Sequence, residues 1–123
     1  MSFAAIQYQQ TRVSTASPVQ VVISLYEGAI RFLKEAILAQ GAHELGRRGV
    51  ALSRAHAIVT ELRVTLDHDR APELSAQLDG LYDFVIDRIN AATRGGDAAL
   101  VEPALRVLTS LHSAWVEISR RSV

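Results

Sequence analysis

The sequence predicts an all-α protein: an antiparallel up-down-up-down four-helix bundle preceded by an N-terminal arm. Apolar residues recur at helical spacing in four stretches of about 20 residues, and short turns rich in Gly, Pro and Asp separate them. No segment alternates apolar and polar residues for long enough to form a strand. Because short turns place consecutive helices side by side in opposite directions, the antiparallel bundle is the expected architecture.

Residues 1–16 are polar and Gln-rich, and we predict that they form an arm, with residues 17–123 as the bundle domain. Ile6 and Tyr8 are too few apolar residues to fold by themselves. They either dock on the bundle, where they would cover a partner's groove, or remain an unattached tail. The sequence alone leaves both alternatives open.

The first helix is predicted to begin at Ser17-Pro18-Val19-Gln20, which places Ser at the N-cap, Pro at N1 and Gln at N3. Gly41 is the expected stop. Its apolar residues cover most of the circumference, and Val21, Leu25 and Phe32 form a second stripe. Such a wide apolar surface favours a helix that is buried more deeply than its neighbours.

The second helix is predicted over about residues 43–67, with a seam that repeats every seven residues, typical of a bundle. The seam consists of Leu45, Leu52, Val59 and Leu66, with Ala55 and Leu62 between them. Pro72 and Glu73 open the third helix, and Gly95-Gly96 end it. Its apolar side carries Leu74, Leu78, Leu81, Tyr82, Val85, Ile86 and Ile89.

Asp97 is the expected cap of the fourth helix, whose apolar side carries Leu100, Ala104, Val107, Leu111, Trp115 and Ile118. Pro103 lies about six residues into that stretch, where it would remove one backbone hydrogen bond. Either the first turn is kinked or the helix begins near Glu102.

Composition excludes several classes of protein. Thirteen basic residues balance thirteen acidic ones, so net charge gives no reason to expect a nucleic acid as partner. There is no cysteine, which suits a reducing cytoplasm and excludes Cys-based metal or redox sites. The N-terminus lacks the pattern of a secretory signal, and the longest uncharged run is too short for insertion in a membrane. We therefore expect a cytoplasmic protein.

Motifs for catalysis or cofactor binding are largely missing. The four histidines have no metal-ligand spacing, the glycines form no phosphate-binding loop, and no serine lies in a nucleophile elbow. We therefore predict a binding protein without cofactor or metal, not an enzyme. One remote alternative is a helical ribonuclease of the HEPN type, in which Arg63 would hold a phosphate and His68 would move a proton.

The informative residues are apolar ones on the outward side of their helices. In the second helix Val50, Ala57 and Val64 lie opposite the seam, and in the third Gly80, Phe84 and Ala91 share a side facing away from Tyr82 and Val85. Together they would form a shallow groove for an apolar helix of a partner. The alternative is ordinary scatter of apolar residues over a protein surface, and the pattern favours neither strongly.

Several stretches together resemble the flagellar export chaperones of the FliS family. They are Tyr8-Gln9-Gln10, then Val13-Ser14-Thr15-Ala16-Ser17-Pro18, Leu25-Tyr26-Glu27-Gly28-Ala29, residues 55–62, Thr65-Leu66-Asp67, and Leu81-Tyr82-Asp83 with Arg88-Ile89. Trp115 falls where the family often has a late tryptophan, and the similarity covers about residues 5–118. Departures are Thr93 in place of a frequent Asn, Pro103, and the short sequence after Trp115.

The resemblance implies a four-helix bundle that binds the C-terminal segment of flagellin, prevents its premature polymerisation and delivers it to the flagellar type III export apparatus. It also implies that the arm, including Ile6 and Tyr8, covers part of the binding surface before cargo arrives. A generic helical adaptor or another secretion chaperone is the alternative function. Self-association remains open.

Overall fold

The computed structural model describes residues 17–121. They form α2 (Pro18–Gly41), α3 (Leu45–Val64), α4 (Pro72–Gly95), the 3-10 turn η1 (Ala98–Val101) and α5 (Glu102–Arg121). The predicted arm, with Ile6 and Tyr8, lies outside the described residues.

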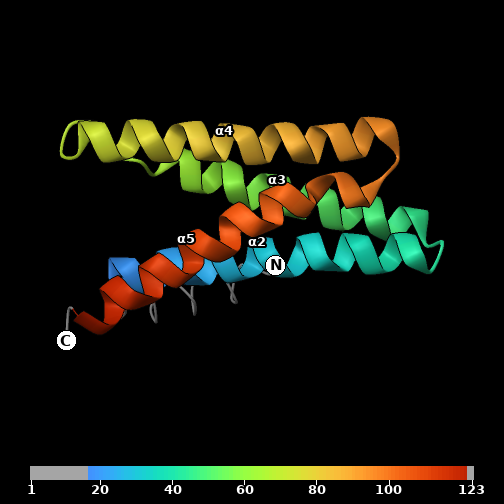
Figure 1. Cartoon of the computed structure of the whole chain (residues 1–123), viewed down its shortest axis with the longest axis horizontal. Helices are drawn as coiled ribbons and strands as arrows, with labels where there is room; N and C mark the ends of the chain where they lie inside the picture. Colours follow the sequence, from blue (N-terminus) through green and yellow to red (C-terminus); the bar gives the residue numbers. More distant parts are fainter. Residues whose placement is uncertain (1–16, 122–123) are drawn as a thin grey trace, which may run out of the picture.

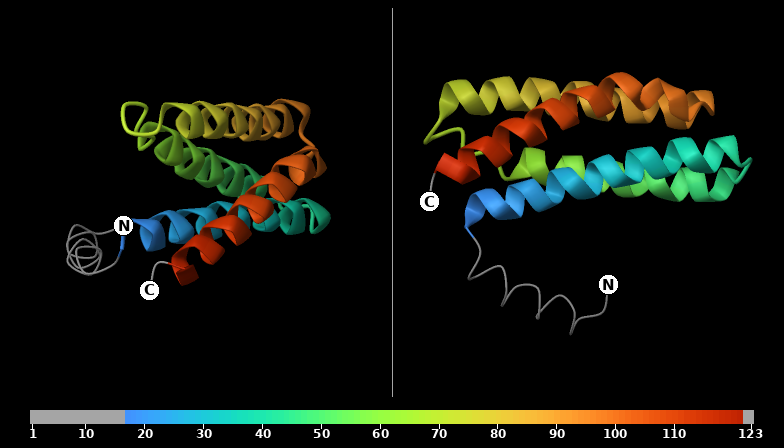
Figure 2. Two further views of the ribbon diagram at one scale, coloured as in Figure 1. Left: turned by 60° about the vertical axis from the view of Figure 1, so that its left-hand side comes forward. Right: turned by 60° about the horizontal axis from the view of Figure 1, so that its bottom comes forward.

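Consecutive helices run in alternating directions, which confirms the up-down-up-down bundle (Figure 1). Within residues 17–121 the chain has no strand. α3 packs against α2 on one side and α4 on the other, and α5 packs across α2 and α4. In all views α5 starts beside the end of α4 and runs obliquely to the start of α2 (Figures 1 and 2). The N-terminal half of α4 therefore lies away from the C-terminal half of α5.

The core follows the predicted seams. Fully buried side chains from all four helices and η1 meet along the bundle axis; the largest are Tyr26, Leu33, Leu52, Val59, Leu62, Tyr82, Val85, Ile89, Val101 and Leu108. Gly28 permits the close approach of α2 and α3, because a Cβ atom there would lie 3.2 Å from Cδ1 of Ile58. The predicted second stripe of α2, Val21, Leu25 and Phe32, is half-buried, and Leu25 and Phe32 pack against the core.

Three residues predicted on the apolar sides of their helices, Leu45, Leu74 and Ile118, are exposed instead. Leu45 is the first residue of α3 and Leu74 the third of α4, and both are exposed. Helical periodicity assigns a face but not the point at which neighbouring helices stop overlapping, so it is least informative at helix ends. The predicted range 43–67 for the second helix was too long for the same reason.

The helix ends follow local chemistry. The Ser17 hydroxyl accepts a hydrogen bond from the Gln20 amide at 3.3 Å, and Pro18 and Pro72 occupy first-turn positions, as predicted. Gly96 ends α4 in the left-handed conformation, with φ of 63°. After α2, however, the left-handed residue is His43, with φ of 59°, not Gly41.

The structure settles the position of Pro103. The Asp97 carboxylate accepts a hydrogen bond from the Ala99 amide at 3.0 Å and caps the 3-10 turn, and α5 begins afterwards at Glu102. Pro103 therefore lies in the first turn of α5, where its missing N–H leaves no hydrogen bond unmade. Nε of Arg88 donates to the carbonyl of Leu100 at 2.9 Å and ties the turn to α4.

Candidate binding surfaces

The predicted partner-binding residues of α3 face solvent. Val50 and Val64 are 51% and 73% exposed, and Ala57 between them is exposed as well. Leu52 and Val59, on the opposite side of the helix, are buried in the core. We call Val50, Ala57 and Val64 the outer face of α3. A helix with valines on both its core side and its solvent side has apolar surface that the bundle itself does not cover.

The predicted residues of α4 also point outward. Phe84 is 41% exposed, Gly80 is exposed with no atom within 4 Å of an added Cβ, and Ala91 is half-buried. These residues are separated from the outer face of α3 by ion pairs. By helical projection, Arg63 and its partners Asp79 and Asp83 lie between the two sets.

Arg63 joins α3 to α4. Its Nε donates to Oδ1 of Asp79 at 2.7 Å, and one terminal nitrogen reaches Asp83 at 3.3 Å. Hydrogen bonding to Asp79 raises the pKa of Arg63, and the same contact lowers the pKa of Asp79. His68 is exposed in the turn after α3. Because two carboxylates occupy the guanidinium, Arg63 is not placed to hold a phosphate in the way the ribonuclease alternative requires.

No metal or membrane site emerges from the described part of the chain. Residues 17–121 contain no group of three or more His, Asp or Glu side chains close enough to hold a metal ion. Among the helices of the same range, none is long and apolar enough to cross a membrane.

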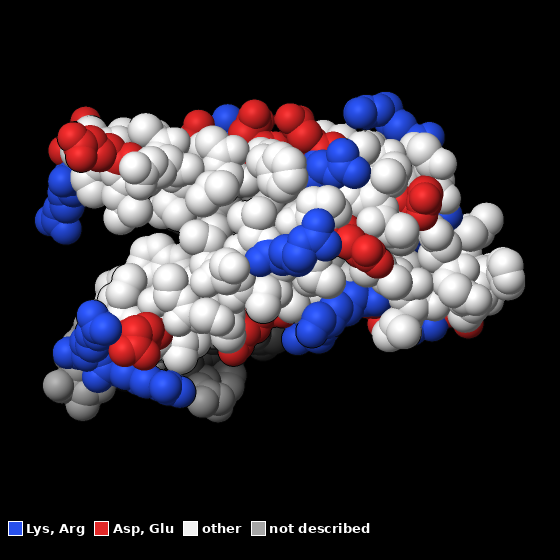
Figure 3. Space-filling model, viewed as in Figure 1, with Lys and Arg blue, Asp and Glu red and all other residues white. Residues whose placement is uncertain are grey.

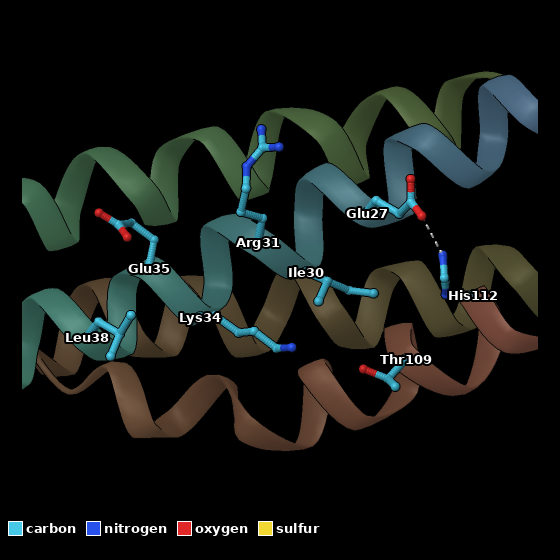
Figure 4. A pocket seen from close by; sticks show the side chains of 8 residues that line it. All are labelled: Glu27, Ile30, Arg31, Lys34, Glu35, Leu38, Thr109 and His112. Carbon is cyan, nitrogen blue, oxygen red and sulfur yellow. Dashed lines mark hydrogen bonds and ion pairs between the residues drawn. The ribbon is translucent and has the colours of Figure 1, made fainter.

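A shallow groove of about 490 Å³ runs between α2 and α5. Ile30, Lys34 and Leu38 project from α2 toward α5, and Thr109 approaches from the other side (Figure 4). His112 closes one end through a 3.1 Å contact between its Nε2 and the Glu27 carboxylate. The groove has apolar side chains at its base and charged side chains at its edges. Such a lining is better suited to binding one side of an amphipathic segment than to binding a small polar molecule.

A smaller cleft of about 180 Å³ lies between α2 and α3. Its centre is Phe32, with the guanidinium carbons of Arg31 and Arg54 at 5.1 and 5.6 Å from the ring centroid. Val50 lines the same cleft. Arg47 at its edge is held by Glu35 and Glu44, whereas Arg31 and Arg54 form no ion pair within residues 17–121.

Between the N-terminal half of α4 and α5, the front of the molecule is hollowed and largely free of charged side chains (Figure 3). The core also contains an aromatic cluster that sequence reasoning did not foresee. The hydroxyls of Tyr26 and Tyr82 are 2.5 Å apart in the core, and the ring of Trp115 lies 6.5 Å from that of Tyr26. Burial raises the pKa of both tyrosines. The repeated Leu-Tyr-Glu and Leu-Tyr-Asp motifs were the only available sign of this pair.

Comparison with protein families gives one match over almost the whole chain. The family described as "Flagellar protein FliS" matches residues 1–122.

Individual relatives agree with that match. Flagellar secretion chaperone FliSB of Pseudomonas aeruginosa is 32% identical over 117 residues, covering 92% of this chain and 93% of the relative. Flagellar secretion chaperone FliS of Bacillus subtilis is 32% identical over 108 residues, covering 88% of this chain and 80% of the relative. The Salmonella typhimurium protein of that name is 32% identical over 114 residues, covering 92% and 84%.

The fold also has a counterpart among solved structures. The crystal structure of a bacterial flagellar chaperone superposes with a TM-score of 0.80, covering 96% of both chains at 22% sequence identity. At that identity the superposition supports the four-helix fold.

Proposed function

The chain belongs to the FliS family of flagellar proteins, and from this membership we propose that it is a flagellin-specific type III export chaperone. It binds the C-terminal segment of flagellin in the cytoplasm, prevents premature polymerisation and delivers the cargo to the flagellar export apparatus. The match over residues 1–122 is the observation that carries the proposal. The relatives' names, flagellar secretion chaperones, support it.

The proposed contact surface comprises the outward residues of α3 and α4, Val50, Ala57, Val64, Gly80, Phe84 and Ala91. A cargo segment that is disordered alone loses conformational entropy when it binds, and buried apolar area must offset that cost. The exposed fractions of Val64 and Phe84 leave such area available, at roughly 25 cal/mol per Å² removed from water. The ion pairs of Arg63 divide this surface, so we propose that cargo lies along both helices instead of in one continuous groove.

The N-terminal arm is part of the proposal. Residues 1–16 precede α2, and Ile6 and Tyr8 supply apolar side chains that would cover part of the binding surface until cargo displaces them. Deletion of residues 1–16 should then increase the affinity for flagellin, because binding no longer requires the arm to leave.

Calorimetric titration of the full chain with a flagellin C-terminal peptide tests the function. We expect saturable one-to-one binding with a negative heat-capacity change, the signature of apolar burial. A peptide from the N-terminal end of flagellin is the matched control. Absence of binding at micromolar concentration would exclude flagellin as the cargo and leave another flagellar protein in its place.

A further inference from the structure

The cleft around Phe32 contains positive charge that the bundle does not neutralise. The guanidinium carbons of Arg31 and Arg54 lie 5.1 and 5.6 Å from the centroid of the Phe32 ring. Arg31 comes from α2 and Arg54 from α3, so one ring brings like charges from two helices close together. Like charges at such a separation repel each other, and an anion bound beside them removes the repulsion. The pair is therefore arranged to receive an anion.

The carboxylate that lines this cleft already has a partner. Glu35 is held by Arg47, and the hydrogen bond between them lowers the pKa of Glu35. Arg47 also contacts Glu44, so its own charge is neutralised within the chain. Neither Arg31 nor Arg54 forms an ion pair with any residue that the structure describes. The cleft therefore keeps an excess of positive charge.

The rest of the sequence has no acidic side chain to offer these two arginines. All thirteen acidic residues lie between Glu27 and Glu117, so residues 1–16 and 122–123 contain no Asp or Glu. The N-terminal arm therefore cannot supply a carboxylate side chain, wherever it lies. An acidic side chain beside the Phe32 ring has to come from another molecule.

The cleft adjoins the surface proposed for the cargo. Val50 lines the cleft and belongs to the outer face of α3. Arg54 follows Val50 by four residues and precedes Ala57 by three, so it lies along the same side of α3. A segment that packs on Val50 and Ala57 passes within reach of Arg54, and Arg31 shares the same ring. The molecule that covers the outer face of α3 is therefore the one that can supply the anion.

We propose that Arg31 and Arg54 are specificity residues that bind an acidic side chain of the flagellin segment beside the Phe32 ring. The inference rests on the proposed function, because it assigns one chemical group of that cargo to one place on the bundle. Guanidinium groups bind carboxylates through charge-assisted hydrogen bonds, and contact with the Phe32 ring holds both guanidinium groups at the cleft. A basic side chain at the same point of the segment would be repelled. The cleft thus selects a segment in which an acidic residue lies next to apolar ones.

A double-mutant cycle between protein and peptide tests this contact. Each Asp or Glu of a flagellin C-terminal peptide is changed singly to its amide, and each peptide is titrated by calorimetry into the full chain and into the Arg54→Gln variant. Arg54→Gln and Arg31→Gln should each weaken binding of the unchanged peptide about fivefold. One amide peptide should bind the wild-type chain about fivefold more weakly than the unchanged peptide, yet lose almost nothing further with Arg54→Gln. Every other amide substitution should change the affinity by the same factor for both proteins.

Arg106→Gln is the matched control, because it removes the same charge from an exposed position of α5 that has no ion pair with any described residue. This variant should bind the peptide like the wild type. Circular dichroism should show unchanged helical content in all three variants, since Arg31 and Arg54 are exposed as well. If the wild type binds the peptide but no amide substitution is coupled to Arg54, or if Arg106→Gln is as weak as Arg54→Gln, the inference is wrong and the proposed function stands. A wild-type chain that does not bind the peptide overturns both.

Discussion

The hydroxyl pair of Tyr26 and Tyr82 allows the packing of three helices to be tested by a double-mutant cycle. The side chains are 0% and 2% exposed, and their hydroxyls are 2.5 Å apart. A hydrogen bond of this kind contributes about 1 kcal/mol net, and a buried hydroxyl left without a partner costs about 1–3 kcal/mol. The ring of Trp115 lies beside that of Tyr26, with the two centroids 6.5 Å apart, so removal of the two hydroxyls is not equivalent.

We expect Tyr26→Phe to be the more damaging change, because it orphans the Tyr82 hydroxyl, with a cost of about 2 kcal/mol against about 1 kcal/mol for Tyr82→Phe. The double variant should cost at least about 1 kcal/mol less than the sum, since it leaves neither tyrosine hydroxyl unpaired.

Urea denaturation followed by far-UV circular dichroism measures these differences. With a slope of about 1.5 kcal/mol/M, a loss of about 1.5 kcal/mol moves the midpoint by roughly 1 M. Tyr82→Phe combined with Gly96→Ala is the control cycle, because about 20 Å of helix separates those sites and their effects should add. If the tyrosine pair is as additive as the control, the hydroxyl contact does not contribute to stability.

Three further predictions follow from individual groups. Burial raises the pKa of Tyr26 and Tyr82 above 10, so in alkali the native state binds more protons than the unfolded chain. The free energy of unfolding should therefore fall as pH rises above 10, and it should fall less steeply in the double Phe variant. Urea titrations at several pH values measure both slopes. Hydrogen bonds from Gln40 and the Ala99 amide lower the pKa of Asp97 below 3.8, so its contribution to stability is present above that pH and is lost as pH falls through the lowered value. In the same titrations, Asp97→Asn should reduce the loss of stability in acid. Gly96→Ala should destabilise the protein by about 1 kcal/mol because Gly96 has a φ of 63°, whereas Gly80→Ala, in an open helical position, should stabilise it by about 0.5–1 kcal/mol. In thermal melts, the first variant should lower the melting temperature and the second should raise it.

Sequence reasoning succeeded where the determinant is local. The Ser17 cap, the prolines at positions 18 and 72 and the Gly96 terminator act within a few residues of themselves, and all are observed. The seven-residue seam of α3 placed Leu52, Val59 and Leu62 in the core for the same reason. Local rules also left Pro103 with two alternatives, and in the structure α5 begins at Glu102, after a 3-10 turn that Arg88 ties to α4.

Contacts between distant residues were beyond sequence reasoning. The Tyr26–Tyr82 bond joins residues 56 positions apart, and Arg63 finds its partners 16 and 20 positions away. Helical projection correctly indicated that Val64 and Phe84 face outward, but it could not show that the Arg63 ion pairs lie between their helices. The identity of whatever covers these residues stays a prediction.

The most direct test of the proposed chaperone function compares the flagellin-peptide affinity of variants at outward-facing apolar positions of α3 and α4 with that of variants at exposed polar positions of α5. Val64→Asp and Phe84→Asp should each weaken binding about tenfold or more, because a carboxylate would be desolvated against an apolar segment. Ser110→Asp and Ser113→Asp, on exposed polar positions of α5 outside the proposed contact surface, are the controls and should bind like the wild type. Helical content by circular dichroism should be unchanged in all four. Wild-type affinity in both apolar variants would contradict the proposal that α3 and α4 hold the cargo.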